Sequence, residues 1–296
     1  MKIQQKQNSL ILLLLMYCIY SYGQQQDDIS TRLSHTLEGD SDANIFNFDF
    51  TAKLYSKPLK NGRGQFRVDV TSNYSNIDYN TPVLFEEDLD KFYNFGISLT
   101  YFKVLNRKWS FVGILRPQLS SNFTSDITYD DFNPNAIILF NYITKPVNRL
   151  TFGVAYNPYA GIGVPIIPIA NYWKKFNEKT EMNIGFPETS FTYNISPKTS
   201  LKALAKFEGF NYNISENFNL NNEEVERINY NEIITGLELK QKLSNTINIT
   251  LNTGYTVNRT FEFTDTSGDK ISGFDMENNF NISLGLGFKL DAKKKK

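Results

Sequence analysis

The chain has little of the chemistry that enzymes and nucleic-acid binders use. It contains one cysteine and one histidine in 296 residues, which excludes a disulfide framework, a thiolate zinc cluster and most histidine-based catalysis. Lys plus Arg and Asp plus Glu both number 31, so the net charge of zero lacks the basic excess of a nucleic-acid binder. No nucleophile elbow, zinc-protease or nucleotide-loop pattern occurs. We therefore expect no enzyme, no cofactor, no metal site and no nucleic-acid partner.

The N-terminus has the pattern of an export signal. Two lysines precede the apolar run 10–20, and the small residue Gly23 follows it. This arrangement indicates a secretory signal peptide, and the run is shorter than the roughly 20 residues that a membrane-spanning helix needs. We expect cleavage after Gly23, with Cys18 discarded in the signal. The predicted organisation is a signal peptide at 1–23, one folded domain at 24–290 and a basic periplasmic tail at 291–296.

The folded domain alternates apolar and polar side chains, which is the pattern of strands with one apolar face. The last run is the clearest, because every second residue from Phe280 to Leu290 is apolar and the residues between them are polar or glycine. Similar runs occupy 46–54, 93–101 and 246–257. Runs of about 10–14 residues fit the roughly 9–11 of a transmembrane strand better than the 5–6 of a globular one. We expect the apolar face to meet lipid and the polar face to line a lumen.

The connections between these runs fall into two classes. Short turns at 57–63, 104–107, 145–148, 177–180, 196–199 and 243–246 alternate with longer polar loops at 38–42, 77–90, 121–133, 216–227 and 261–275. The five long loops hold 19 acidic residues and only two basic ones. Outer-membrane barrels place short turns on the periplasmic side and long loops outside the cell. The sequence therefore predicts an all-β, antiparallel, up-and-down transmembrane barrel, located in the outer membrane, with both termini periplasmic.

The alternation of direction allows the strands to be counted. Fourteen strands are predicted, at 28–37, 43–56, 64–76, 91–103, 108–120, 134–144, 149–158, 164–176, 178–186, 189–196, 199–214, 228–242, 246–260 and 276–290. The alternative is twelve strands, with 178–196 folded in or lying in the periplasm. Both numbers are even, as a closed barrel with both termini on one side requires.

The candidate functional residues are the charged side chains on the polar faces. The predicted lumen lining is Asp49, Lys53, Arg67, Asp69, Lys108, Arg116, Lys202, Lys206, Glu208, Glu232, Glu238 and Lys240. These residues could form a selectivity lining or pair with one another and fill the interior. Because the signs balance, no strong preference for anions or cations follows. His35 shares the outward face with Leu33 and Leu37, so we interpret it as an interfacial residue and not as a catalytic base.

The chain resembles the uncharacterised outer-membrane β-barrel proteins of Gram-negative bacteria that are grouped as a domain of unknown function. The resemblance rests on the Lys57-Pro58-Leu59 turn, the Gly185-Phe186-Pro187 and Ser196-Pro197-Lys198 segments, the end of the signal and the final strand. It implies an integral outer-membrane location and no known reaction.

Two functions are compatible with such a barrel. The first is porin-like passage or uptake of small solutes, through a lumen that is narrow or plugged, because twelve to fourteen strands lie between the roughly 8 of filled barrels and the 16–18 of open porins. The alternative is a structural or surface-interaction barrel whose acidic loops meet a partner. The expected partners are outer-membrane lipid, lipopolysaccharide and the barrel-assembly machinery. The sequence does not specify which solute passes or whether the acidic loops bind cations.

Overall fold

The computed structural model describes residues 28–37, 43–60, 62–80, 89–159, 165–220, 222–265, 267–274 and 276–290. The predicted signal peptide at 1–23 and the basic tail at 291–296 lie outside these residues. Within them, no helix is long and apolar enough to cross a membrane. The described loops include the 3-10 turn η2 (Tyr129–Asp131).

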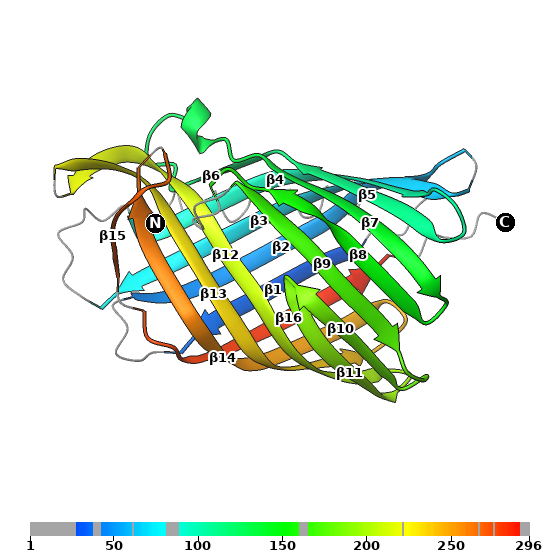
Figure 1. Ribbon diagram of the computed structural model, residues 1–296. Coiled ribbons are helices and arrows are strands. Elements are labelled where there is room, and N and C mark those ends of the chain that lie inside the picture. Colours follow the sequence, from blue (N-terminus) through cyan, green and yellow to red (C-terminus); the bar gives the residue numbers. More distant parts are fainter. Residues whose placement is uncertain are drawn as a thin grey trace.

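The described chain forms one antiparallel sheet that closes on itself (Figure 1). Its strands are β1 (Asp28–Thr36), β2 (Ala43–Pro58), β3 (Gly64–Tyr79), β4 (Lys91–Val104), β5 (Trp109–Arg116), β6 (Gln118–Ser121), β7 (Asn135–Lys145), β8 (Asn148–Tyr156), β9 (Ile166–Lys175), β10 (Thr180–Phe186), β11 (Glu188–Ser196), β12 (Thr199–Leu220), β13 (Glu223–Lys242), β14 (Ile247–Thr264), β15 (Lys270–Phe274) and β16 (Phe280–Lys289). Pairing of β1 with β16 and of β11 with β12 closes the ring.

Fourteen of these segments make the wall of the barrel. The strand β6 continues β5 beyond Pro117, and β15 pairs only with the outer end of β14. The fourteen-strand prediction is confirmed. The twelve-strand alternative is wrong, because residues 178–196 supply β10 and β11 as two paired wall strands.

Short turns lie at the end of the barrel where β1 begins and β16 ends, which we call the terminal end. Side chains within these turns satisfy the backbone: the Asn106 carboxamide oxygen accepts from the N–H groups of Lys108 and Trp109, and Ser244 does the same for Thr246 and Ile247. Asn and Ser favour tight turns for this reason. The opposite end, which carries the longer connections, is the loop end.

The outer surface of the barrel is apolar over the part of its length that the short wall strands β8–β11 cover. On β16, Leu284 is 44% exposed, whereas its neighbour Ser283 is 3% exposed and turned inward. Leu284 lies in register between Leu33 of β1 and Leu251 of β14, which are also exposed. A contiguous apolar belt of this kind is the lipid-facing band of a transmembrane barrel. The predicted orientation of the faces is therefore confirmed on these strands.

Two predicted loops turn out to be extended strands. The segment 216–227 is the hairpin between β12 and β13, and 261–275 contains the end of β14 and all of β15. The strands β12, β13 and β14 have 22, 20 and 18 residues, well beyond the roughly 9–11 that cross a membrane. Their loop-end halves therefore project past the apolar belt, and the turn-forming residues there stand in the exposed end of a strand hairpin rather than in a loop.

The interior at the loop end is packed and apolar, so the polar lining predicted for the lumen does not continue to this end and the lumen is plugged there, one of the two forms expected from the number of strands. Buried side chains of β2–β4 and β12–β14, with two from the described loops, form the loop-end core: Ala43, Ile45, Ile77, Leu89, Phe92, Tyr212, Ile214, Val225, Ile228, Tyr230, Phe261, Phe263 and Met276. The rings of Phe92 and Tyr212 stack with centroids 5.0 Å apart. The alternation of β12 continues without a break, but its inward residues change from Lys206 and Glu208 to Tyr212 and Ile214.

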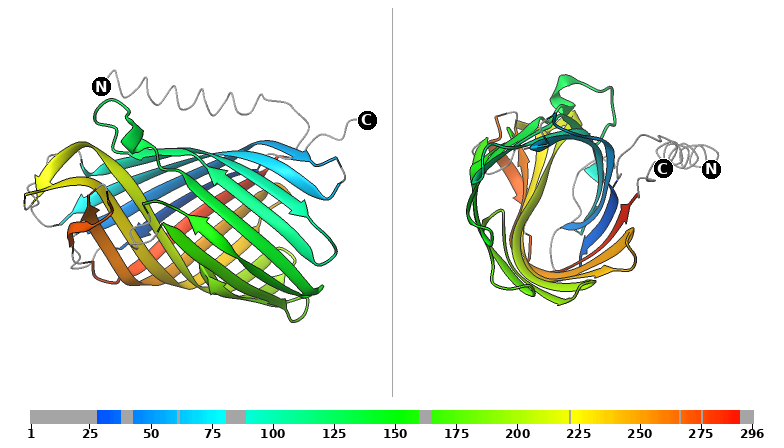
Figure 2. Two further views of the ribbon diagram at one scale, coloured as in Figure 1. Left: turned by 45° about the horizontal axis from the view of Figure 1, so that its top comes forward. Right: turned by 90° about the vertical axis from the view of Figure 1, so that its right-hand side faces the viewer.

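The loop-end core forms because β12 and β13 bend into the barrel. The view along the barrel shows them inside the arc made by the green strands (Figure 2). At this height Asn213 of β12 pairs directly with Ser121 of β6, bypassing β7–β11. The Ser120 hydroxyl also donates to the carbonyl of Asn211 at 2.7 Å. The barrel thus narrows to two sheets packed face to face at the loop end and stays wide toward the terminal end.

Candidate functional site

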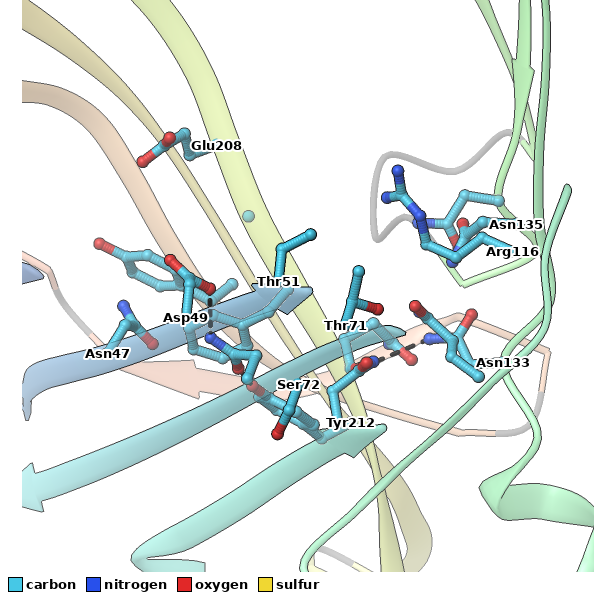
Figure 3. Close-up of a pocket in the computed structure, with 18 of the residues that line it drawn as sticks. Asn47, Asp49, Thr51, Thr71, Ser72, Arg116, Asn133, Asn135, Glu208 and Tyr212 are labelled. Atoms are coloured by element: carbon cyan, nitrogen blue, oxygen red, sulfur yellow. Dashed lines mark hydrogen bonds between the residues drawn. The ribbon is translucent and has the colours of Figure 1, made fainter. Parts of the chain in front are cut away.

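The wide part of the barrel encloses a cavity of about 760 Å³, which we call the central cavity. Its lining comes from inward positions of β1–β9, β12 and β13 and from the segment between β6 and β7, and it is rich in asparagine, serine, threonine and charged side chains (Figure 3). A second space of about 400 Å³, the terminal cavity, is lined by β10–β13 and the turn between β11 and β12. Both are polar because period-two strands send their hydrophilic residues inward here.

An arginine on β1 bridges two sides of the central cavity. The Nε of Arg32 donates to Asp49 Oδ2 of the neighbouring strand at 2.9 Å, and its Nη1 donates to Glu208 Oε1 of β12 at 2.7 Å. Lys206 holds the same Glu208 oxygen at 2.8 Å. Each of these side chains is no more than about one third exposed, so the pairs have limited contact with water and tie β1 to β12 across the lumen.

A chain of hydrogen bonds runs from this bridge to the loop-end core. Asn73 donates to Asp49 Oδ1 at 2.8 Å, and the Tyr212 hydroxyl donates to Asn73. The same hydroxyl lies 2.7 Å from the hydroxyl of Ser75, which donates to Asn47. The Tyr212 ring belongs to the core while its hydroxyl belongs to the network. Tyr212 therefore marks the boundary between the polar cavity and the apolar plug above it.

Glu232 has its own partners on β13 and β14. The Tyr230 hydroxyl donates to Glu232 Oε2 at 2.7 Å, and Arg259 Nε donates to that hydroxyl at 3.0 Å. The distance from Arg259 Nε to Glu232 Oε2 is 4.0 Å. The three carboxylates of the central cavity, on Asp49, Glu208 and Glu232, thus each have a cation within ion-pair distance.

Arg116 is arranged differently. It extends from the end of β5 into the central cavity, facing the side that carries Asp49 and Glu208 (Figure 3). Among the ion pairs of the described residues none includes Arg116, and its Nε is buried without a hydrogen-bond partner. Amide side chains surround it, notably Asn133 and Asn135. The cavity therefore has a paired side and a side with an uncompensated cation.

The predicted lining residues divide into several groups. Asp49, Arg116, Glu208 and Glu232 line the central cavity, and Lys202, Glu238 and Lys240 line the terminal cavity. Lys206 pairs with Glu208, Lys202 with Glu188 and Glu238, and Arg67 with Asp69. Lys53 is half-buried on β2, and Lys108 is exposed in the turn between β4 and β5, outside the strand that was predicted to hold it. The mutual-pairing interpretation describes most of them.

Sequence reasoning missed two arginines of the network. Arg32 could have been found, because the outward phase of Leu33 and Leu37 places residue 32 inside. Arg259 could not, because the alternation of Tyr255 and Val257 places residue 259 outside. Asn258 has a φ of 55° and the β13–β14 register shifts nearby, so the phase is reversed beyond it. A bulge of this kind adds one residue without a reliable sequence signal.

The loop between β6 and β7 covers the outward face of β12 and β13 at the loop end. The Arg227 guanidinium lies 3.4 Å from the centroid of the Tyr159 ring and donates to the Asp130 carbonyl at 2.6 Å. Burial under these groups lowers the pKa of Arg227 from its ordinary value. Arg227 is one of the two basic residues of the predicted acidic loops. It is therefore a buried residue that holds the covering loop against β13, and not a surface charge.

Together these features define a closed membrane-type β-barrel with an apolar outer belt, a plugged loop end and polar cavities inside. The chain belongs to the family DUF6268, a domain of unknown function, whose model matches residues 22–291. No curated protein sequence matches it.

Several solved barrels are similar in fold. An outer-membrane channel from Pseudomonas putida F1 has 8% identity and a TM-score of 0.49, over 91% of this chain and 97% of that chain. A FadL homologue from Pseudomonas aeruginosa has 8% identity and a TM-score of 0.47, over 90% of both chains. The translocator domain of the autotransporter NalP from Neisseria meningitidis has 10% identity and a TM-score of 0.41, over 97% of this chain and 96% of that chain.

Proposed function

We propose that the protein is an integral outer-membrane barrel that passes small polar solutes, with its terminal end toward the periplasm. The observation that carries the proposal is the central cavity. Its volume of about 760 Å³ lies within the roughly 300–1,000 Å³ of small-molecule sites, and its walls are polar inside a lipid-facing shell. A barrel with only a scaffolding role gains nothing from a polar space of this size.

In this proposal the loop-end core is a gate. Phe92, Tyr212 and Phe261 are at most 1% exposed and lie between the central cavity and the loop end. Solutes therefore enter when this core opens and meet the charged network below it. Lipid and lipopolysaccharide would surround the apolar belt, and insertion would use the barrel-assembly machinery.

Swelling of proteoliposomes in a neutral polar solute, such as arabinose, tests this function. The wild type should swell faster than protein-free vesicles, and Phe92→Ala should be faster still, because it opens space in the gate. Leu251→Ala, which removes a lipid-facing side chain that is 40% exposed, is the matched control and should behave as the wild type. Impermeability of both the wild type and Phe92→Ala would overturn the proposal.

The second candidate is a structural or surface-interaction barrel without transport. The observation that favours it is the Arg32 bridge, which together with the core braces the lumen across its width. It predicts that vesicles containing the wild type or Phe92→Ala swell no faster than protein-free vesicles. We assign no reaction to either candidate, since the one histidine, His35, shares the outward face of β1 with Leu33 and contacts Phe46.

A further inference from the structure

The central cavity has one cationic group, on Arg116, that forms no ion pair among the described residues. Arg32 and Lys206 share the carboxylates of Asp49 and Glu208. The carboxylate that interacts electrostatically with Arg116 is Asp69, and both oxygens of Asp69 are held by Arg67 at 2.7 Å. The guanidinium of Arg116 therefore lines the cavity without a counter-charge of its own, and its terminal nitrogens are the donors that a ligand can reach. A planar fork of this kind matches a carboxylate in a bidentate arrangement.

The side chains near Arg116 are amides and a hydroxyl, which form hydrogen bonds with hydroxyl groups. Asn133 lines the cavity and is 2% exposed, its side-chain nitrogen donates to the Asn211 carbonyl at 3.5 Å, and its side-chain oxygen is buried without a hydrogen-bond partner. Asn94, Gln118 and Thr71 line the same cavity. A buried acceptor without a partner costs about 1–3 kcal/mol, so a ligand hydroxyl that donates to Asn133 would remove that cost.

The placement of the site also fits a ligand in transit. Arg116 ends β5, directly before Pro117, which interrupts the strand so that the chain continues as β6. The arginine lies in the central cavity across from Asp49 and Glu208, the two carboxylates of the Arg32 bridge (Figure 3). An anion there meets Arg116 on one side, while the negative groups on the other side are already neutralised.

We propose that the Arg116 side of the central cavity binds the carboxylate of a small hydroxylated organic acid. The guanidinium of Arg116 pairs with the carboxylate, and the Asn133 oxygen accepts from a ligand hydroxyl. The proposal names the solute class for the passage proposed above and in that sense rests on it, although binding itself needs no passage.

Isothermal titration of the detergent-solubilised barrel with sodium gluconate, and with sorbitol as its uncharged analogue, tests the site. Gluconate should bind the wild type with a Kd of about 1 mM or below, and sorbitol at least about tenfold more weakly, since it lacks the charge-assisted pair. Arg116→Met should weaken gluconate binding about tenfold, and Arg116→Lys should be intermediate, because it keeps the charge without the fork. Lys240→Met, which removes a cation from the terminal cavity, is the control and should bind as the wild type.

Equal binding of gluconate and sorbitol, no binding of gluconate, or an unchanged affinity in Arg116→Met would each overturn the proposal. The comparison of the two ligands on the wild type decides the matter even where a variant does not fold. Arabinose swelling separates the two proposals. Swelling without gluconate binding leaves passage intact and removes the site, whereas gluconate binding without swelling keeps the site and removes passage.

Discussion

Arginine substitutions along β16 test the lipid-facing assignment on which the barrel depends. Leu284 is 44% exposed and has leucines beside it on both neighbouring strands. An arginine on the lipid face of a barrel costs about 2–4 kcal/mol at the bilayer midplane and about 0–1 kcal/mol near the interfaces. Leu284→Arg should therefore lower the free energy of unfolding by about 2–4 kcal/mol.

Depth supplies the control, at Leu290 directly after the end of β16. At a tilt of about 40° a rise of 3.4 Å per residue gives about 2.6 Å of depth, so Leu290 lies about 16 Å from Leu284. The apolar band is about 25 Å tall, and the exposed apolar series of β16 begins at Phe280, which puts Leu284 near its middle and Leu290 outside it. Leu290→Arg should cost at most about 1 kcal/mol.

The measurement is urea unfolding of the barrel in lipid vesicles, followed by the fluorescence of its two tryptophans. The inward position Ser283 gives a third value: Ser283→Ala loses the hydrogen bond from Asn252, 3.0 Å long, and should cost about 1 kcal/mol. Equal losses for Leu284→Arg and Leu290→Arg would refute the reasoning, since only a bilayer makes the cost depend on depth.

Further predictions concern the bridge, a glycine and the gate. Arg32→Met leaves Asp49 without its cation and should cost about 1 kcal/mol in the same titration, the bridge being partly exposed. Gly185→Ala places a Cβ 2.0 Å from the Ala170 carbonyl oxygen at a φ of +146°, and should reduce the refolded yield far more than Gly62→Ala, where a φ of +63° meets open space. Tyr212→Phe removes the hydroxyl that joins the gate to the network, and should lower the unfolding free energy by about 1 kcal/mol and speed arabinose swelling.

The strand count was predictable because lipid contact is a local demand on every second residue. The hairpin 178–196 shows this well: Ile184 and Phe191 point outward with 49% and 48% exposure, so even short strands keep the period. The turns at 104–107, 177–180, 196–199 and 243–246 were also local, since each is capped by its own Asn or Ser. The alternation of apolar and polar residues does not specify whether an apolar face meets lipid or a protein core. Tyr212 and Leu284 are both apolar residues in alternating strands, yet one is inside a plug and the other in lipid.

The distinction follows from height along the barrel, which no single strand reveals. The Glu223–Glu224 end of β13 pairs with Leu220 and Asn219 of β12 in water, so acidic residues are tolerated there and the segment resembles a loop in sequence. Once β12 and β13 extend beyond the membrane they can bend inward, and the face that was polar inside the barrel can become apolar against β2–β4. The plug is thus a long-range consequence of strand length.

The candidate site depends on the distances between charged groups, which the composition does not give. The sequence predicts that the positive and negative side chains in the lumen balance. The absence of a strong preference for anions or cations follows only if each of these charges acts equally on a solute. Distances remove that equivalence: Arg32, Lys206, Asp49 and Glu208 compensate one another within 2.9 Å, whereas Arg116 has no such partner among the described residues. A solute experiences the potential of the charges that stay unpaired, so a balanced lumen can still prefer anions at one place. In the proposed channel, selectivity is then set by the side chains that do not reach a counter-charge, and for Arg116 this is decided by the register of β5 beside the break at Pro117.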